Sequence, residues 1–224
     1  MKNPKAKMWL ALVISFVLIA LALFISAGTI NYWQAWAYLG VVAVCGVLLT
    51  IYMVKDPRLV KSRLKFGPAA EQRPIQKIIV WFLLLPLVAA YIVPALGRRF
   101  GWLSVPSWLS IAGDLLIIAS MWVAYRVLKE NSFGSATVEI SKGQKVISTG
   151  PYAIVRNPMY SSAVVYCIAL SLALGSYWGL IPSILMVIGF VLRLYDEEKF
   201  LAKDLPGYAE YCAKVRWHLI PGIF

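Results

Sequence analysis

Charge and metal-binding side chains are scarce in this sequence of 224 residues. Only 14% of its residues are charged, against about 25% in a typical soluble domain. It has one histidine, His218, and three cysteines, Cys45, Cys167 and Cys212. One histidine excludes a site built from several, and the cysteines form no pair at metal-ligand or redox spacing. We therefore expect neither a bound metal nor a cysteine redox centre.

Hydrophobic residues make up 61% of the chain and fall into six long runs. Most of these runs approach the ~20 residues that a helix needs to cross a bilayer. The first run is longer than the apolar core of a cleaved signal peptide, about 7 to 15 residues, so we expect it to be retained. The sequence predicts an all-α membrane protein, a bundle of about five to six transmembrane helices, with runs at 8–30, 32–54, 77–96, 107–128, 159–174 and 177–194.

Basic residues gather on one side of this predicted bundle. Of the 22 Lys and Arg residues, all but Arg98 and Arg99 fall before the first run, in alternate loops or in the tail. The positive-inside rule makes that side cytoplasmic and predicts a multi-pass protein with both termini in the cytoplasm. The net charge of +12 then reflects topology and attraction to anionic membrane lipids, not to nucleic acid.

The chain divides into two regions by composition. Region 1–128 holds the first four apolar runs, together with a basic connector at 55–77 that we interpret as an interfacial, partly helical segment or as a solvated loop. Pro86, Pro94 and Pro182 are expected to interrupt helices. Asp114 is the only acid well inside an apolar run, and we expect it to hydrogen-bond to Ser or Tyr on a neighbouring helix. Region 129–224 carries a long polar loop, a helical hairpin and a tail.

Two polar elements flank that hairpin. The first runs from Gly150 to Tyr160 and the second is the run RLYDEE at 193–198. Charged side chains beside membrane helices are costly and mark functional sites by default. Arg193 and Glu197 share one helix face. They are either an ordinary ion pair or part of a binding site in which carboxylates hold an ammonium or ribose hydroxyls.

The loop before the hairpin is expected to cover the helix ends. Residues 138–140 and 145–147 flank Ser141, Lys142 and Gly143, which suggests a short extended hairpin or an irregular cover. Pro158 suits the first turn of a helix. The unpaired backbone N–H groups of a helix starting near Met159 would attract an anionic or polar ligand group.

The second half resembles the isoprenylcysteine carboxyl methyltransferase family. The resemblance covers about 131–222 and rests on the order of QKVISTGPYAIVRNPMY at 144–160, RLYDEE at 193–198, GYAEY at 207–211 and IPG at 220–222. It implies an integral membrane enzyme that transfers a methyl group from S-adenosylmethionine. The cofactor-binding half would face the cytoplasm, and the acceptor would be a lipophilic carboxylate, such as an isoprenylcysteine-like or isoprenoid acid, entering from the bilayer.

The resemblance also implies roles for individual residues. Arg193 would face the substrate carboxylate as a catalytic and substrate-binding residue, and Glu197 would bind the cofactor. We expect Arg156, as a second catalytic residue, to pair with the cofactor's carboxylate unless it merely anchors the helix start, and Glu198 to anchor the cofactor beside Glu197. The remaining cofactor-binding residues would be Asn131, Thr137, Gln144, Lys145, Val146, Ile147, Tyr152, Asn157, Pro158, Met159 and Tyr160.

One departure from the family concerns Asn157, which stands where the family has histidine. An amide donates and accepts hydrogen bonds but cannot transfer a proton as imidazole does, so we expect this position to bind rather than catalyse.

Other functions remain open at this point. An amine acceptor would need a base, for which Glu197, Glu198 and Tyr160 are the candidates. A membrane reductase of the sterol-reductase type would use NADPH, but no glycine-rich dinucleotide motif is evident. A transporter or non-catalytic subunit would need more polar residues at the midplane. The sequence does not indicate an oligomeric state.

Overall fold

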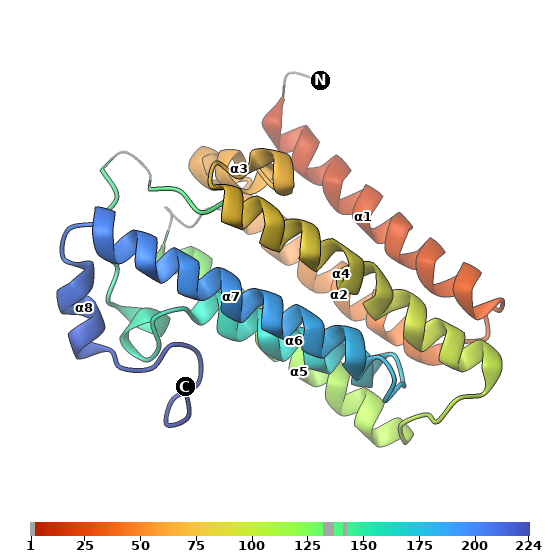
Figure 1. Ribbon diagram of the computed structural model, residues 1–224. Helices are drawn as coiled ribbons and strands as arrows, with labels where there is room; N and C mark the ends of the chain where they lie inside the picture. The colour runs from red at the N-terminus through yellow and green to blue at the C-terminus, as the bar shows by residue number, and fades with distance from the viewer. Residues whose placement is uncertain (1–2, 132–136, 141–142) are drawn as a thin grey trace.

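Six long helices lie side by side in the computed structural model, which describes residues 3–131, 137–140 and 143–224 (Figure 1). In the order α1, α2, α5, α6, α7, α4, each helix packs against the next, and α4 packs against α1. The prediction of an all-α membrane protein is confirmed. The long helices are α1 (Pro4–Ala27), α2 (Trp33–Met53), α4 (Pro74–Phe100), α5 (Ser107–Glu130), α6 (Pro158–Ala173) and α7 (Leu180–Asp204).

Short elements lie in the connections. The predicted connector at 55–77 contains α3 (Pro57–Leu64) and the 3₁₀ turn η1 (Pro68–Ala70), so its partly helical character is confirmed. A second 3₁₀ turn, η2 (Gly150–Ala153), precedes α6, and α8 (Tyr208–Lys214) follows α7. In Figure 1, α3, α8 and the C-terminus lie at one end of the bundle, and the α1–α2, α4–α5 and α6–α7 connections lie at the other.

Four helices are long and apolar enough to cross a membrane by length and composition, namely α1, α2, α4 and α5. Of the two others, α6 is shorter, with 16 residues, and α7 carries Arg193, Asp196 and Glu197 in its second half. Five to six membrane-spanning helices were predicted. That α6 and α7 also cross the membrane stays a prediction.

Local sequence signals set most helix ends. The side chains of Asn3 and Asp56 accept hydrogen bonds from the backbone N–H groups of Lys5 and Arg58, which caps α1 and α3. Proline occupies the first turn of α1, α3, α4 and α6, where no N–H is needed. Gly28 ends α1 in the left-handed conformation, which glycine adopts without strain.

Pro86, Pro94 and Pro182, which are expected to interrupt helices, all lie within assigned helices. Helix α4 continues through Pro86 and Pro94, as membrane helices allow when neighbouring groups take over the freed carbonyls. Pro182 lies in the first turn of α7, where the missing N–H would have had no partner within the helix.

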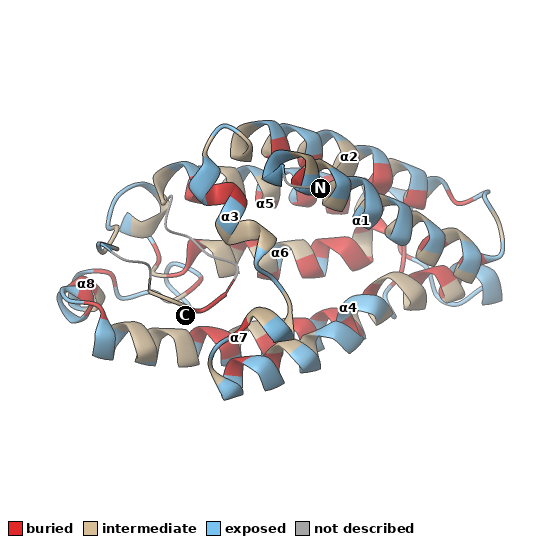
Figure 2. Cartoon of the chain, turned by 90° about the horizontal axis from the view of Figure 1, so that it is seen from above, coloured by how far each residue is buried: buried red, intermediate tan, exposed pale blue. Residues whose placement is uncertain are grey.

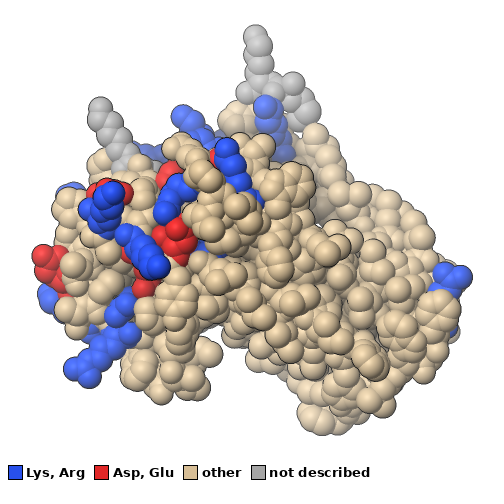
Figure 3. Space-filling view, in the orientation of Figure 1, with Lys and Arg blue, Asp and Glu red and all other residues tan. Residues whose placement is uncertain are grey.

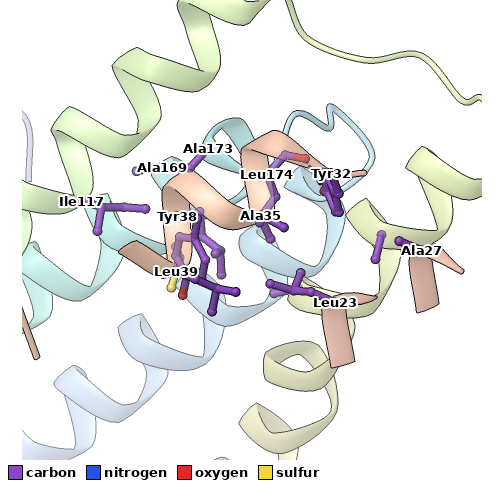
Figure 4. Close-up of a cluster of buried hydrophobic side chains, with 14 of the residues drawn as sticks. Leu23, Ala27, Tyr32, Ala35, Tyr38, Leu39, Ile117, Ala169, Ala173 and Leu174 are labelled. Atoms are coloured by element: carbon purple, nitrogen blue, oxygen red, sulfur yellow. Dashed lines mark hydrogen bonds between the residues drawn. The ribbon is translucent and has the colours of Figure 1, made fainter. Parts of the chain in front are cut away.

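The core combines apolar packing with hydroxyl hydrogen bonds between helices. Figure 4 shows part of the main cluster, which includes Leu23, Tyr38 and Ile117. The Tyr38 hydroxyl on α2 is hydrogen-bonded to the Tyr166 hydroxyl on α6 at 2.7 Å and to the Tyr91 hydroxyl on α4 at 3.2 Å. Because neighbouring lipid is as apolar as leucine, such polar contacts and close packing hold membrane helices together.

Small residues bring α5 and α6 into close contact. A Cβ atom on Gly113 would lie 2.5 Å from the Ala173 backbone nitrogen and 2.9 Å from the Ala169 carbonyl oxygen. The Ser162 hydroxyl of α6 donates to the Ser120 carbonyl of α5 at 2.7 Å. The two helices that lead into and out of the long polar loop are therefore fixed against each other.

Asp114 is buried on α5, with 7% of its surface exposed. Its Oδ1 atom has no hydrogen-bond partner among the described residues. Among the described residues, Asp114 Oδ1 therefore accepts no hydrogen bond from a Ser or Tyr of a neighbouring helix, which was the partner expected for Asp114.

Charged residues and exposed apolar residues occupy different parts of the bundle surface. On the face shown in Figure 3, charged side chains gather at the end that carries α3 and α8, and the middle of that face is almost free of them. Arg98 and Arg99 lie in the last turn of α4, at the other end. Exposed residues cover the outward faces of the helices (Figure 2), and many are large and apolar, as Leu18, Leu85 and Ile111 illustrate. This surface has the pattern of a bundle surrounded by lipid.

The long polar loop covers the charged end without forming a sheet. Residues 137–140 and 144–147 have no regular secondary structure, so the irregular cover, and not the extended hairpin, describes them. Ser141 and Lys142, expected in the turn of that hairpin, lie outside the described residues.

Candidate functional site

A cavity of about 310 Å³ opens at the charged end of the bundle. This volume is at the lower end of the ~300–1,000 Å³ typical of ligand pockets. Residues from α3, α5, η2, α6, α7, α8 and the irregular cover line it. They are Arg63, Val127, Asn131, Thr137, Val138, Glu139, Gln144, Lys145, Val146, Ile147, Tyr152, Arg156, Asn157, Pro158, Met159, Tyr160, Arg193, Glu197, Leu201, Leu205, Tyr208 and Tyr211.

Every predicted site residue except Glu198 is in this lining. The segments 144–147 and 157–160, which are neighbours in neither sequence nor secondary structure, face the same space as Arg193 and Glu197. The cavity also contains residues from the N-terminal side of the predicted boundary at 128, namely Arg63 and Val127. The roles of these residues stay predictions, but the structure brings them together.

The start of α6 forms one wall. Pro158 occupies the first helical position and Asn157 precedes it. The Asn157 side-chain amide donates to Glu198 Oε1 at 2.6 Å, and its backbone N–H donates to the His218 carbonyl at 3.1 Å. Because the amide is already held by Glu198, Asn157 shapes the wall and fixes the helix start.

Tyr160 in the first turn of α6 connects this wall to Glu197 and Arg193 of α7. The Tyr160 hydroxyl donates to Glu197 Oε2 at 2.6 Å and accepts from Arg193 Nε at 3.1 Å. Burial raises the pKa of Glu197, the Tyr160 hydrogen bond and Arg193 oppose that rise, and the charges of Glu71 and Glu198 add to it. Burial thus disfavours the ionised form of the Glu197 carboxylate. A cationic ligand or hydroxyl donors would stabilise that form.

Arg193 has a partner that the sequence did not indicate. Its Nη2 atom lies 2.6 Å from Glu71 Oε1, and Glu71 is 3% exposed. Glu71 Oε2 also accepts from the Val138 backbone N–H at 3.1 Å. One buried carboxylate therefore connects α7, the cover and the segment before α4.

Glu71 and Arg63 were missed as individual site residues because both lie in the basic connector. In sequence, the connector reads as a positively charged loop broken by proline, and Glu71 as one acid within it. The burial of Leu59 and Val60 on α3 turns this segment toward the protein, and only the folded chain shows where its polar side chains end. The signal available in the sequence was one acid, Glu71, among many basic residues.

Arg156 lines the cavity, and its predicted catalytic role stays a prediction, but its hydrogen bonds are made to the tail and to Glu198. Its Nε atom donates to the Val215 carbonyl at 2.6 Å and Nη2 to the Cys212 carbonyl at 3.0 Å, while Nη1 lies 3.4 Å from Glu198 Oε2. All three nitrogens hold the tail or Glu198, so Arg156 anchors the C-terminal segment against the start of α6.

Glu198 likewise serves the framework. It is not among the described residues that line the cavity, and its carboxylate binds Asn157, Arg156 and His218. Residues 197 and 198 point about 100° apart around the helix, and the role of Glu198 as a cofactor anchor beside Glu197 stays a prediction. Through these contacts Glu198 fixes Asn157 and Arg156, which line the cavity.

Tyr152 links the cover to α5. Its hydroxyl accepts from the Asn131 side-chain amide at 2.9 Å, and its carbonyl accepts from the Tyr211 hydroxyl of α8 at 2.7 Å. Burial raises the pKa of Tyr152, so the phenol stays neutral near pH 7. Asn131, Tyr152 and Tyr211 thus contribute a neutral polar surface to the cavity lining.

Comparison with known families identifies part of the chain. The model of the phospholipid methyltransferase family matches residues 108–206. The match begins in α5 and ends just after α7, so it includes most of the cavity lining. A search of curated proteins gave no match. From α5 to the end of α7 the chain is similar to phospholipid methyltransferases, which supports an S-adenosylmethionine-dependent methyltransferase in a membrane.

Proposed function

We propose that this protein transfers a methyl group from S-adenosylmethionine to the carboxylate of a lipophilic acceptor, such as an isoprenylcysteine-like or isoprenoid acid. One observation carries the proposal. Within the segment similar to methyltransferases, a single cavity contains both a carboxylate suited to the donor, Glu197, and a buried guanidinium suited to an acid, Arg193.

The lining residues fit S-adenosylmethionine chemically. Glu197 accepts a hydrogen bond from Tyr160 and is destabilised by burial, so it would gain from ribose hydroxyls or an ammonium group. Val146, Ile147 and Met159 offer apolar surface for a flat ring system, and Asn131 and Gln144 offer amides. The bound cofactor would supply a methyl group on a sulfonium, which makes the methyl carbon electrophilic.

Arg193 would position the acceptor. Helix α7 runs toward the charged end, so Arg193 lies one turn, about 6 Å, closer to the apolar part of the bundle than Glu197. A carboxylate bound at Arg193 would therefore have its hydrocarbon chain on the membrane side and the donor on the polar side. Glu71 already contacts Nη2, so an incoming acid would share Arg193 with it.

The chain's contribution to the reaction would be alignment and exclusion of water. A carboxylate acceptor is ionised near pH 7 and needs no general base. Holding acceptor and donor in line, with reacting atoms about 3 to 3.5 Å apart, lowers the entropic part of the barrier. The irregular cover, fixed by Glu71 and by the Tyr152–Tyr211 contact, would keep water out of the cavity.

Two measurements test this proposal. Calorimetric titration of the detergent-purified protein with S-adenosylmethionine should show saturable binding, and Glu197→Gln should weaken it about 10- to 100-fold because a charged hydrogen bond is lost. NADPH should not bind. Binding of NADPH alone would contradict the proposal and favour a reductase.

The second measurement identifies the acceptor by the product's stability. The enzyme is given methyl-labelled S-adenosylmethionine and either a prenylated N-acetylcysteine or phosphatidylethanolamine vesicles. A methyl ester releases labelled methanol in alkali, whereas an N-methyl group does not. Alkali-labile label from the acid is the expected result, and alkali-stable label in phosphatidylethanolamine would show that the acceptor is an amine.

A further inference from the structure

Arg63 extends from α3 into the cavity, where the sequence indicated only a basic connector. It lines the same space as Tyr152 and Glu197, and both of these groups lie close enough to influence its pKa. Yet α3 lies before residue 108, outside the segment similar to methyltransferases. The N-terminal part of the chain therefore supplies a cation to the cavity.

This guanidinium differs from the two other arginines of the cavity. Arg193 is paired with Glu71 and Arg156 with Glu198. The Nε atom of Arg63 is buried and has no hydrogen-bond partner in the described part of the chain. A buried donor without a partner destabilises a protein by an amount comparable to a lost hydrogen bond, so the site is incomplete without a ligand acceptor.

The surroundings of Arg63 favour the binding of a second anion, besides the nearby Glu197 carboxylate. Burial lowers the pKa of Arg63, while Tyr152 and Glu197 act in the opposite direction. Arg156, the residue expected to meet the cofactor's carboxylate, is occupied by the tail. Among the described cavity residues, Arg63 is therefore the arginine with an unused Nε donor for that carboxylate.

We propose that Arg63 binds a ligand carboxylate in this cavity, either the amino-acid carboxylate of S-adenosylmethionine or the carboxylate of the acceptor. A planar guanidinium suits this task because it can offer two parallel donors to the two oxygens of an acid. The inference rests on the proposed function and adds a binding residue that the family match does not reach.

Calorimetry on Arg63→Gln with four ligands tests it. These are S-adenosylmethionine, decarboxylated S-adenosylmethionine, a prenylated N-acetylcysteine and the amide of that acid. If Arg63 binds the cofactor, the variant should bind S-adenosylmethionine about 10- to 100-fold more weakly and decarboxylated S-adenosylmethionine as wild type does. If it binds the acceptor, the same selective loss should appear between the acid and its amide.

The controls separate this role from a structural one. Arg58→Gln removes an exposed arginine from the same helix and should leave all four affinities unchanged, and Arg63→Lys should restore part of the lost affinity. Equal weakening of a carboxylate ligand and its matched analogue, or no change with any ligand, would overturn the inference. Failure of the wild type to bind S-adenosylmethionine would instead overturn the proposed function.

Discussion

Glu197 shows at the level of one residue how a binding site can oppose stability. Burial raises its pKa above the ordinary value of 4.5, which means that the folded protein holds the proton more tightly than the unfolded chain. The folded state therefore binds more protons in the window from 4.5 up to the raised pKa, and stability falls as pH rises through it. Below pH 4.5 the carboxyl group is neutral in both states, and its ionisation has no effect.

Glu197→Gln should remove this penalty while keeping an acceptor for the Tyr160 hydroxyl. The variant should melt at a higher temperature than the wild type near neutral pH, and the difference should shrink toward zero as pH falls to about 4.5. Thermal unfolding in detergent at several pH values measures this. A variant less stable than the wild type at pH 7, or a difference that does not depend on pH, would contradict it.

The buried pair of Glu71 and Arg193 makes the opposite prediction. Glu71→Ala leaves the Arg193 charge buried without its carboxylate and should destabilise the protein by about 3–5 kcal/mol. Lys65→Ala breaks the more exposed pair with Glu139 and should cost at most about 1 kcal/mol. Chemical unfolding in micelles compares the two.

A double variant checks the cause of that loss. In Glu71→Ala with Arg193→Met no unpaired charge remains, so its stability should exceed that of Glu71→Ala alone. If the second substitution destabilises the protein further, the loss comes from Glu71's contact with Val138 and not from the uncompensated arginine.

At the level of elements, the contact between α5 and α6 depends on the absence of a side chain at Gly113. Gly113→Ala should force the helices apart, because the new Cβ would lie 2.5 Å from backbone that cannot move independently, and should cost about 1–3 kcal/mol. Gly40→Ala on α2 is the matched control, since nothing lies within 4 Å of its Cβ position. It should be neutral or slightly stabilising.

Unfolding measurements on Gly113→Ala and Gly40→Ala show whether only the first substitution destabilises the protein. Because α5 and α6 carry Asn131 and Asn157 into the cavity, Gly113→Ala should also weaken S-adenosylmethionine binding. Equal stability of the two glycine variants would show that the close approach is not needed.

The sequence predicted the elements better than their ends. The apolar run at 159–174 corresponds closely to α6, whereas the run at 177–194 misses the last ten residues of α7. Hydrophobicity marks the part of a helix that meets lipid, and α7 continues past it because its charged residues find partners in the cavity and the loops. Periodicity alone does not reveal that continuation.

The site was predictable where its residues form a motif. The family resemblance implied segments 144–147 and 157–160 as site residues, and they line one cavity. Glu71 was not among them, because its role depends on a contact with Arg193, 122 residues away. The motif also does not show that the tail returns to bind Arg156 and that Glu198 holds Asn157 and His218.

At the level of the whole molecule, the charged end carries the cavity, α3, α8 and the C-terminus. The positive-inside rule predicts that this end is cytoplasmic. In a variant with Cys45, Cys167 and Cys212 replaced by serine, single cysteines at the exposed positions Lys214 and Leu103 test this. An impermeant maleimide should label Lys214→Cys from the cytoplasmic side and Leu103→Cys from the other.

A third cysteine at Lys5 completes the test, because both termini are expected on one side. Labelling of Lys5→Cys together with Leu103→Cys would show that the termini lie on opposite sides and that the number of crossings is odd. Labelling of all three from one side would show that α1, α2 and α4 do not all cross the membrane, because an even number of crossings would then separate Lys5 from Leu103.

The contact from Glu71 to both Arg193 and Val138 limits how this protein can be recombined with its relatives. A transplanted segment that began at residue 108 would carry most of the cavity lining but neither Glu71 nor Arg63. Its Arg193 would lose the Glu71 carboxylate, and its cover would lose the contact at Val138. Chimeras designed to change the acceptor should therefore transfer residues 57–77 together with the C-terminal half.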